Sequence, residues 1–190
     1  MRIIAGQKRG LRLLSPKGDV SRPITDRVKE SVFSVLYKYD IPVDMTVADV
    51  FSGVGSIGLE ALSRGAKFCT FIEKDSRVVA VLEKNIAKAG FVKESKVIRT
   101  NAFKSGAPVV EEKYQFVSID PPFPLTKDVS ETSQFADMLE VLQSQLAPDA
   151  IVIIRTHKCV DLLEKYGFLK QIDRRKWGIN AVAIFQYDIR

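Results

Sequence analysis

The sequence predicts an α/β domain built on a mainly parallel β-sheet. Short apolar runs, typical of buried strands, alternate along most of the 190 residues with segments whose apolar side chains have helical spacing. The strand-like runs are continuously apolar, as expected for strands that helices cover on both faces. A basic segment of different composition precedes this pattern. We therefore expect a small N-terminal arm at residues 1–24 and one α/β domain at residues 25–190.

The N-terminal segment has the pattern of a β-hairpin. Ile and Leu at residues 3–4 and within residues 11–14 flank a turn-forming stretch at residues 6–10. Residues 1–29 carry eight Lys and Arg against two Asp, so they hold all of the net charge of +6. A charge excess confined to one segment indicates a polyanionic partner, although a solubilising tail has the same composition. We interpret the arm as nucleic-acid-binding, with the candidate contacts Lys8, Arg9, Arg12, Arg22 and Arg27.

The elements of the domain follow in order. A first helix is expected at residues 26–39, with Asp26 as its N-cap and Pro42 beyond its end. The expected strands are residues 47–51, 68–72, 96–99, 116–119, 150–154, 169–174 and 179–187, and the further helices are residues 56–64, 78–89, 135–146, stopped by Pro148, and 161–166. The last two strands flank Trp177-Gly178 as a hairpin. The predicted sheet therefore has seven strands and an antiparallel C-terminal edge.

The first strand leads into a glycine-rich loop. Gly53, Gly55 and Gly58 match G-x-G-x-x-G between a strand and a helix, where glycines permit unusual backbone angles and close approach of a ligand. Glu73 ends the next strand, where a carboxylate can accept hydrogen bonds from two ribose hydroxyls. This arrangement predicts a Rossmann-like sheet with a nucleotide-type cofactor, and both NAD and S-adenosylmethionine satisfy it. Asp49, at the end of the strand, can order the loop and the amino-acid portion of S-adenosylmethionine, which favours that cofactor.

A second motif follows the strand at residues 116–119. Asp120-Pro121-Pro122-Phe123 places a carboxylate, two rigid prolines and an aromatic ring at the sheet edge where such folds bind ligands. The Asp120 carboxylate and the Pro121 carbonyl can accept hydrogen bonds from an exocyclic amine and favour its developing tetrahedral nitrogen. Phe123 offers a face on which a nucleobase can stack, worth ~1–3 kcal/mol. The motif therefore indicates methyl transfer to a nucleobase amine, which again favours S-adenosylmethionine.

This motif is similar to the (Asp/Asn/Ser)-Pro-Pro-(Tyr/Phe/Trp) motif of amino-group methyltransferases, and the whole chain resembles the RsmD family, which methylates N2 of a guanine in bacterial 16S rRNA. The resemblance spans nearly all 190 residues and rests on Met1 to Gly6, Gly10, Leu13, Arg22-Pro23, Thr25 to Glu30, Phe33, Asp49, Phe51, Gly53, Gly55, Gly58 to Ala66 and Glu73. It implies a class I S-adenosylmethionine-dependent methyltransferase fold, with 16S rRNA or a partly assembled small ribosomal subunit as the partner. It also implies cofactor contacts from Asp49, Phe51, Gly53, Gly55, Gly58, Glu73, Asn101 and Ala102, and catalysis by Asp120, Pro121, Pro122 and Phe123.

Three positions depart from the family pattern. Phe123 replaces the usual Tyr, Asn101 stands where related methyltransferases often have Asp, and Ile24 stands where the family usually has Thr. Two other functions fit the same residues: a DNA adenine-N6 methyltransferase, because the same motif serves that amine, and a catalytically idle RNA-binding factor in ribosome assembly. The small size of the chain weighs against the first, and the intact glycine loop, Glu73 and Asp120 weigh against the second.

The remaining composition indicates a cytoplasmic protein without a metal. Cys69 and Cys159 are far apart, and with a single histidine, His157, they predict neither a disulfide framework nor a zinc site. We expect no secretory signal and no membrane span, because no apolar run approaches ~20 residues. A monomer is the expected state.

Overall fold

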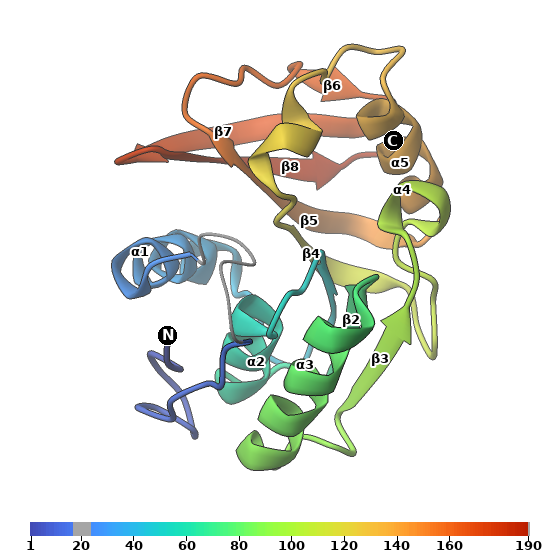
Figure 1. Cartoon of the computed structure of the whole chain (residues 1–190). Helices are drawn as coiled ribbons and strands as arrows, with labels where there is room; N and C mark the ends of the chain where they lie inside the picture. The colour runs from blue at the N-terminus through green and yellow to red at the C-terminus, as the bar shows by residue number, and fades with distance from the viewer. Residues whose placement is uncertain (17–23, 190) are drawn as a thin grey trace.

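The computed structural model describes residues 1–16 and 24–189, which form one eight-stranded mixed sheet with helices on both faces (Figure 1). The strands are β1 (Thr46–Val50), β2 (Phe68–Glu73), β3 (Ser95–Arg99), β4 (Tyr114–Ile119), β5 (Leu146–His157), β6 (Lys165–Tyr166), β7 (Leu169–Trp177) and β8 (Asn180–Tyr187). The helices are α1 (Asp26–Leu36), α2 (Ser56–Ser63), α3 (Ser76–Ala89), α4 (Ala102–Ser105) and α5 (Gln134–Gln143), with 3-10 turns η1 (Tyr37–Tyr39) and η2 (Phe123–Thr126). Within the described residues, no helix has the length and hydropathy needed to cross a membrane.

The strand order is β3-β2-β1-β4-β5-β8-β7-β6, in which β1 to β5 run parallel and β8 is antiparallel to β5. The chain moves outward from β1 to β3 and then returns to place β4 on the other side of β1. Such a reversal of strand order opens a crevice at the carboxyl ends of the strands, which is where open α/β sheets bind ligands. The predicted α/β fold class, with its mainly parallel sheet and antiparallel C-terminal hairpin, is confirmed.

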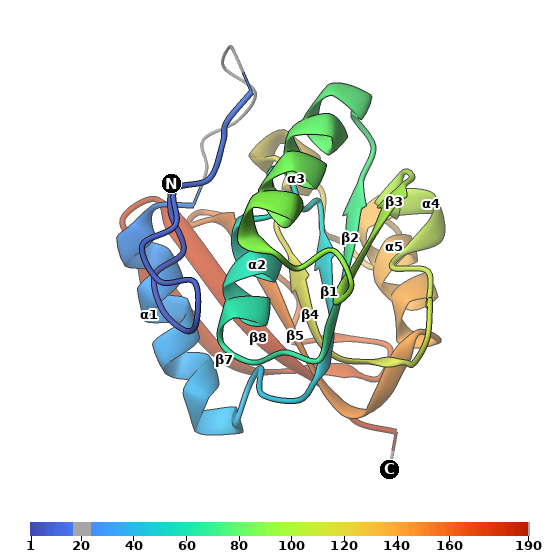
Figure 2. The same ribbon diagram turned by 90° about the horizontal axis from the view of Figure 1, so that it is seen from below.

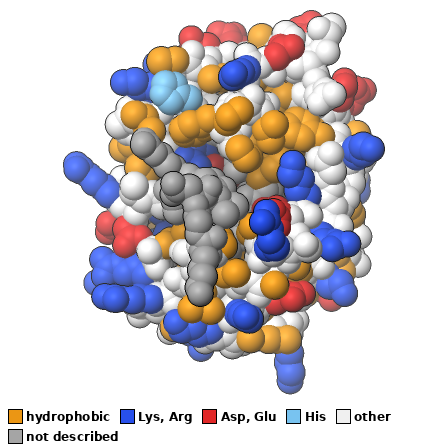
Figure 3. Space-filling model, in the orientation of Figure 1, with side chains coloured by type: hydrophobic (Ala, Val, Ile, Leu, Met, Phe, Trp, Pro, Cys, Tyr) orange, Lys and Arg blue, Asp and Glu red, His pale blue; other side chains and the backbone are white. Residues whose placement is uncertain are grey.

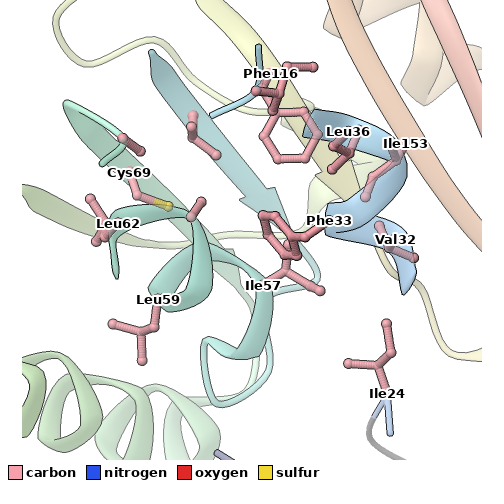
Figure 4. Close-up of a cluster of buried hydrophobic side chains, with 14 of the residues drawn as sticks. Ile24, Val32, Phe33, Leu36, Ile57, Leu59, Leu62, Cys69, Phe116 and Ile153 are labelled. Atoms are coloured by element: carbon pink, nitrogen blue, oxygen red, sulfur yellow. The ribbon is translucent and has the colours of Figure 1, made fainter. Parts of the chain in front are cut away.

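Two buried clusters hold the layers together. Helices α1, α2 and α3 pack on one face of the sheet, and α4 and α5 pack on the other (Figure 2). Neighbouring residues of one strand point to opposite faces, so Phe116 joins the first cluster while Val117 joins the second. Figure 4 shows the first cluster, where Phe33 of α1 lies beside Ile57 of α2 and between it and Phe116. The double burial explains why the strands are continuously apolar.

The prediction of a helix at residues 161–166 is wrong. Lys165–Tyr166 forms the edge strand β6, which pairs with Leu169 and Lys170 across a turn at Gly167, where φ is 57°. The Tyr166 ring is buried, and its hydroxyl donates a hydrogen bond to the Val129 carbonyl at 2.7 Å. These distant contacts fix the extended backbone, and β6 gives the sheet eight strands in place of the seven expected.

Two other boundaries differ from the prediction. The helix expected at residues 135–146 ends at Gln143, because Leu146 already pairs with Tyr114 in the sheet. Pro148, expected to stop a helix, lies inside β5 where the register with β4 shifts, so its missing N–H breaks no regular pairing. The N-cap of α1 is Thr25 rather than Asp26, since the Thr25 hydroxyl accepts the hydrogen bond from a backbone N–H of the first turn.

The N-terminal segment folds back on itself and packs against the domain. Arg2 and Arg12 form an antiparallel bridge, and the Gly10 N–H donates to the Ile3 carbonyl at 2.8 Å. Ile3 and Leu13 are buried in the cluster that Phe33 also joins. The segment lies beside α2 (Figure 1), and the Gln7 N–H donates to the carbonyl of Ser63 at 2.8 Å.

Candidate active site

The predicted site residues meet at the carboxyl edge of the parallel strands. The glycine loop follows β1, Glu73 ends β2, Asn101 follows β3 and Asp120 follows β4. Because β1, β2, β3 and β4 are neighbours in the sheet, residues as far apart as 49 and 120 in the sequence come together there. The strand order, rather than any local feature, creates this grouping.

Asp49 and the glycines shape the loop between β1 and α2. The Asp49 side chain is buried, and Oδ2 accepts a hydrogen bond from the Gly58 N–H at 2.8 Å, so the carboxylate holds the first turn of α2. Gly53 has a φ of 53° and nothing within 4 Å of a Cβ built on it, so its backbone faces open space. A Cβ on Gly58 would lie 2.3 Å from the Phe71 ring, which explains the third glycine as a close helix-to-strand contact.

Glu73 ties the loop to the end of β2. Its Oε2 accepts from the Gly53 N–H at 3.1 Å. Its Oε1 accepts from the backbone N–H groups of Lys74 and Asp75 at 2.8 and 3.0 Å. The side chain is half-buried, and Oε2 keeps acceptor capacity toward a ligand beside the loop. Glu73 is therefore held in place at the position where a ribose is expected.

Two aromatic rings stand between the loop and α4. Phe51, with a φ of 60°, and Phe103 meet edge to face with their ring centroids 5.4 Å apart. Asn101 caps α4, since its Oδ1 accepts from the Phe103 N–H at 3.2 Å, so one acceptor site of the amide oxygen is in use. Ala102 is buried in the second core cluster. The sequence analysis missed Phe103, which follows the predicted Asn101-Ala102 pair directly.

The Asp120 motif continues the edge. The Asp120 N–H donates to the Val50 carbonyl at 3.1 Å, which extends the β1–β4 pairing by one residue. Pro121 is buried, Pro122 is exposed, and half-buried Phe123 begins η2. Leu125 in the same turn is 38% exposed, and Figure 3 shows hydrophobic side chains gathered in a band on this face of the molecule.

Arg155 is a site residue that the sequence analysis missed. It lies near the end of β5, and its Nε donates a short hydrogen bond to Oδ1 of Asp120. Its Nη1 donates to Oδ1 of Asn180 at 2.7 Å, and its Cζ lies 5.2 Å from the centroid of the Phe123 ring. In the sequence, Arg155 is simply an arginine directly after the apolar run at residues 150–154. An arginine at the end of a strand is usually exposed, so this pattern did not indicate a site residue.

Burial governs the electrostatics of this edge. It raises the pKa of Asp49 well above its ordinary value, although the hydrogen bond from Gly58 opposes the shift. Burial also raises the pKa of Asp120, and the Arg155 guanidinium opposes that shift. The charges of Asp120 and Glu73 act on Asp49 as well, so three carboxylates share one small region. Burial therefore favours the uncharged form of Asp49, while Asp120 keeps a cationic partner in Arg155.

Of the proposed nucleic-acid contacts that the structure describes, Lys8, Arg9 and Arg12 lie on the arm and Arg27 lies on α1. Arg9, Arg12 and Arg27 are exposed, and Lys8 is half-buried with its Nζ 5.8 Å from the Phe91 ring. Arg22 lies outside the described residues. Of these residues, Arg12 also accepts a hydrogen bond through its carbonyl from Lys88 Nζ at 2.7 Å, which holds the arm against α3.

His157 and Trp177 have packing roles. The His157 ring meets the Phe123 ring edge to face, with centroids 5.6 Å apart. Trp177 is partly buried against the first core cluster.

A parallel sheet whose order reverses between β1 and β4, with an antiparallel final strand, is the architecture of the class I methyltransferases. The comparisons with known proteins agree. The family described as Conserved hypothetical protein 95 matches residues 1–186. The ribosomal RNA small subunit methyltransferase D of Haemophilus influenzae is 33% identical over 190 residues, which cover 98% of this chain and 93% of that protein. The chain therefore belongs to the RsmD family.

Solved structures show the same fold. The yhhF protein of Escherichia coli is 31% identical, with a TM-score of 0.80 over 100% of this chain and 99% of that one. The RNA methyltransferase of Salinibacter ruber, solved in complex with S-adenosyl-L-homocysteine, has a TM-score of 0.64 at 17% identity and covers 89% of this chain and 95% of that one. The second likeness concerns the fold alone.

Proposed function

We propose that the chain is an S-adenosylmethionine-dependent methyltransferase that modifies the exocyclic N2 amine of a guanine in small-subunit ribosomal RNA. The observation that carries the proposal is the placement of Asp120, buried Pro121 and half-exposed Phe123 at the carboxyl edge of β4, beside the glycine loop. Membership in the RsmD family supports the ribosomal substrate.

The charge of the edge supports this cofactor over a dinucleotide. The Glu73 carboxylate lies against the glycine loop, so the pyrophosphate of NAD would meet a like charge there, whereas a cationic sulfonium would not. The Gly53 N–H, a natural phosphate donor, already bonds to Glu73. Open space at Gly53 leaves room for a ligand against the loop backbone. When bound, the cofactor supplies an electrophilic methyl group.

The residues of the motif orient the amine. In the part of the chain that the structure describes, Oδ2 of Asp120 accepts no hydrogen bond, while Oδ1 is taken by Arg155. Oδ2 and the Pro121 carbonyl can then accept the two N–H groups of the amine, which turns its lone pair toward the methyl donor. Phe123 gives the base a stacking face. The proton released by the methylated amine can pass to water.

Methyl transfer from labelled S-adenosylmethionine tests the proposal. The substrates are 16S rRNA, partly assembled small subunits and duplex DNA, followed by nucleoside analysis. We expect N2-methylguanosine in ribosomal RNA, and a loss of about 10²-fold in Asp120→Ala, the scale of removing one oriented polar group. S-adenosylhomocysteine affinity should change little in that variant.

Three results would contradict the proposal or part of it. N6-methyladenine in DNA would establish the adenine methyltransferase instead. RNA binding without methyl transfer on any of the three substrates would establish a binding factor. Asp120→Ala turning over at the wild-type rate would remove Asp120 from the catalytic residues.

A further inference from the structure

Arg155 connects three strands at the catalytic edge. Ile154 pairs with Ile119 in the parallel register, so the next residues along the two strands, Arg155 and Asp120, come side by side. On the other side of β5, Nη1 of Arg155 donates a hydrogen bond to Oδ1 of Asn180, the first residue of β8, at 2.7 Å. The side chain therefore joins β4 to β8 through β5, where the parallel part of the sheet meets its antiparallel part.

The ion pair is formed in a nearly dry place. The exposed fraction of the side chain is 12% for Arg155 and 18% for Asp120. Both line a cavity of about 10 Å³, whose other walls include Ile24, Ile57 and Ile153. Apolar walls lower the local dielectric constant, so the attraction between the two charges is stronger here than on the surface. The geometry of the pair is therefore well defined.

The same guanidinium also supports the stacking ring. Its Cζ lies 5.2 Å from the Phe123 centroid, a cation–π distance, while His157 meets the ring edge to face at 5.6 Å. A planar guanidinium can bond in its plane and contact a ring with its face, which an ammonium cannot do. Arg155 thus touches both side chains to which the motif assigns a task, the amine acceptor and the stacking surface.

We propose that Arg155 is a positioning residue for methyl transfer, which fixes the Asp120 carboxylate and the Phe123 ring as one unit. This inference rests on the proposed function. By occupying Oδ1, Arg155 directs the other oxygen of Asp120 to the amine. By contacting the ring, it sets the distance between the stacked base and its acceptor. A direct contact of Arg155 with an RNA phosphate is disfavoured, because the guanidinium is nearly buried and already bonded to Asp120 and Asn180.

Arg155 also keeps Asp120 in its accepting form. The Arg155 guanidinium on β5 stabilises the negative charge of Asp120 against the effect of burial, and the neighbouring acidic group on β1 is Asp49, whose own pKa burial raises well above its ordinary value. His157, the nearby titratable group on β5, contacts Phe123. Without the guanidinium, the effect of burial would act unopposed, and Asp120 would bind a proton at a higher pH.

Two substitutions separate geometry from charge. Arg155→Gln removes the charge, whereas Arg155→Lys keeps it and loses the planar fork. For Arg155→Gln we expect kcat to fall by at least about tenfold at neutral pH and the acid limb of the pH profile to move upward, so that activity partly recovers as the pH rises. For Arg155→Lys we expect a lower kcat with the acid limb near its wild-type position. Arg175→Gln, which changes an exposed arginine of β7, is the matched control and should keep the wild-type kcat.

A second readout is independent of activity. Carbon-13 NMR of the labelled aspartate carboxyls follows the Asp120 titration directly, and it should move to higher pH in Arg155→Gln. Thermal melts and S-adenosylhomocysteine binding verify that each variant is folded. Should Arg155→Gln fail to fold, the Arg155→Lys pH profile and titration decide the question.

The outcomes are distinguishable. A wild-type kcat and pH profile in Arg155→Gln would overturn the inference. A higher KM for RNA with an unchanged kcat in both variants would overturn it in favour of a direct RNA contact. A wild-type protein without methyl transfer would contradict the proposed function, while the shifted Asp120 titration would still support the positioning of the carboxylate.

Discussion

Glu60 offers the sharpest test of how the N-terminal segment is held. Its side chain and that of Lys29 are both 0% exposed, and they form an ion pair at 3.3 Å. The Glu60 carboxylate also accepts from the N–H groups of Ile4 and Ala5 at 2.7 and 3.0 Å, and from Arg64 Nε at 2.8 Å. Glu60→Gln preserves the shape and removes the charge, so Lys29 is left buried beside neutral acceptors.

The expected loss of stability follows from burial. Breaking a buried ion pair on one side costs ~3–5 kcal/mol, because the remaining charge stays desolvated. At ~2–4 °C per kcal/mol for a domain of this size, the melting temperature should fall by ~6–20 °C. Urea denaturation gives the free energy of unfolding and circular dichroism gives the melting temperature.

A surface pair provides the control. Glu112 pairs with Lys67 at 2.9 Å, but their side chains are 57% and 53% exposed. Glu112→Gln should therefore change the free energy of unfolding by less than ~1 kcal/mol. Equal losses for the two variants, or a loss below ~1 kcal/mol for Glu60→Gln, would refute the reasoning.

The same variant has a predictable pH dependence. Burial lowers the pKa of Lys29, and the Glu60 carboxylate opposes this shift. A lysine whose folded-state pKa is below the unfolded value of ~10.4 destabilises the fold while it is charged, and stability recovers as the pH rises through that window. Since Glu60→Gln removes the opposing carboxylate, its deficit relative to wild type should shrink at alkaline pH.

Three further predictions concern the cofactor, the RNA and a buried phenol. Glu73→Ala should weaken S-adenosylhomocysteine binding by ~1.5–3 kcal/mol in calorimetry, because a ribose would lose a charged acceptor. An unchanged affinity would place the ribose elsewhere. Neutralising Lys8, Arg9 and Arg12 together should make the slope of log RNA affinity against log salt shallower by ~2–3, with little change in melting temperature. Parallel lines of equal affinity would contradict the role of the arm. Burial raises the pKa of Tyr114 to about 12, so its contribution to stability is complete below pH ~10 and is lost as the pH rises toward the folded-state value. Absorbance titration of Tyr114→Phe should lack the highest-pH phenol ionisation, and an identical curve would contradict this assignment.

Local chemistry explains which parts of the site could be predicted. Gly53 and Gly58 lie in the loop and helix that follow β1, and Asp120 follows β4 directly, so each belongs to a short motif that can be read beside a predicted strand. The sheet order then brings them together without further information. Arg155 could not be predicted in this way, because its partners Asp120 and Asn180 lie 35 and 25 residues away along the chain. Nothing beside it in the sequence distinguishes it from a surface arginine.

The errors in the fold have the same origin. Residues 161–166 contain apolar side chains with helical spacing, and tertiary contacts override that local preference. The Tyr166 hydroxyl bonds to Val129, 37 residues earlier, and the Phe168 N–H bonds to Gln143 Oε1 at 2.6 Å. Leu146 likewise leaves the expected helix because Tyr114 of β4 offers it a partner in the sheet. The local helix propensity of a segment determines its secondary structure only where no distant residue offers it a competing contact.

Buried polar side chains connect the charged arm to the glycine loop, and this connection fixes the position of the arm relative to the candidate site. Asn85 of α3 donates to the Val54 carbonyl of the loop at 3.0 Å and to the Leu14 carbonyl of the arm at 3.1 Å, and its Oδ1 accepts from the Leu14 N–H at 2.7 Å. Lys29 likewise bonds to the Arg2 carbonyl at 2.6 Å and to Ser56 Oγ, at the start of α2, at 3.2 Å. Breaking such bonds would leave buried donors and acceptors unpaired, at ~1–3 kcal/mol each. The arm and the loop therefore keep a fixed relation, although Arg2, Arg9 and Arg12 of the arm are exposed. Phosphates held by those charges would lie at a constant distance from the loop, so that contacts without sequence information can still direct one base to the edge of β4.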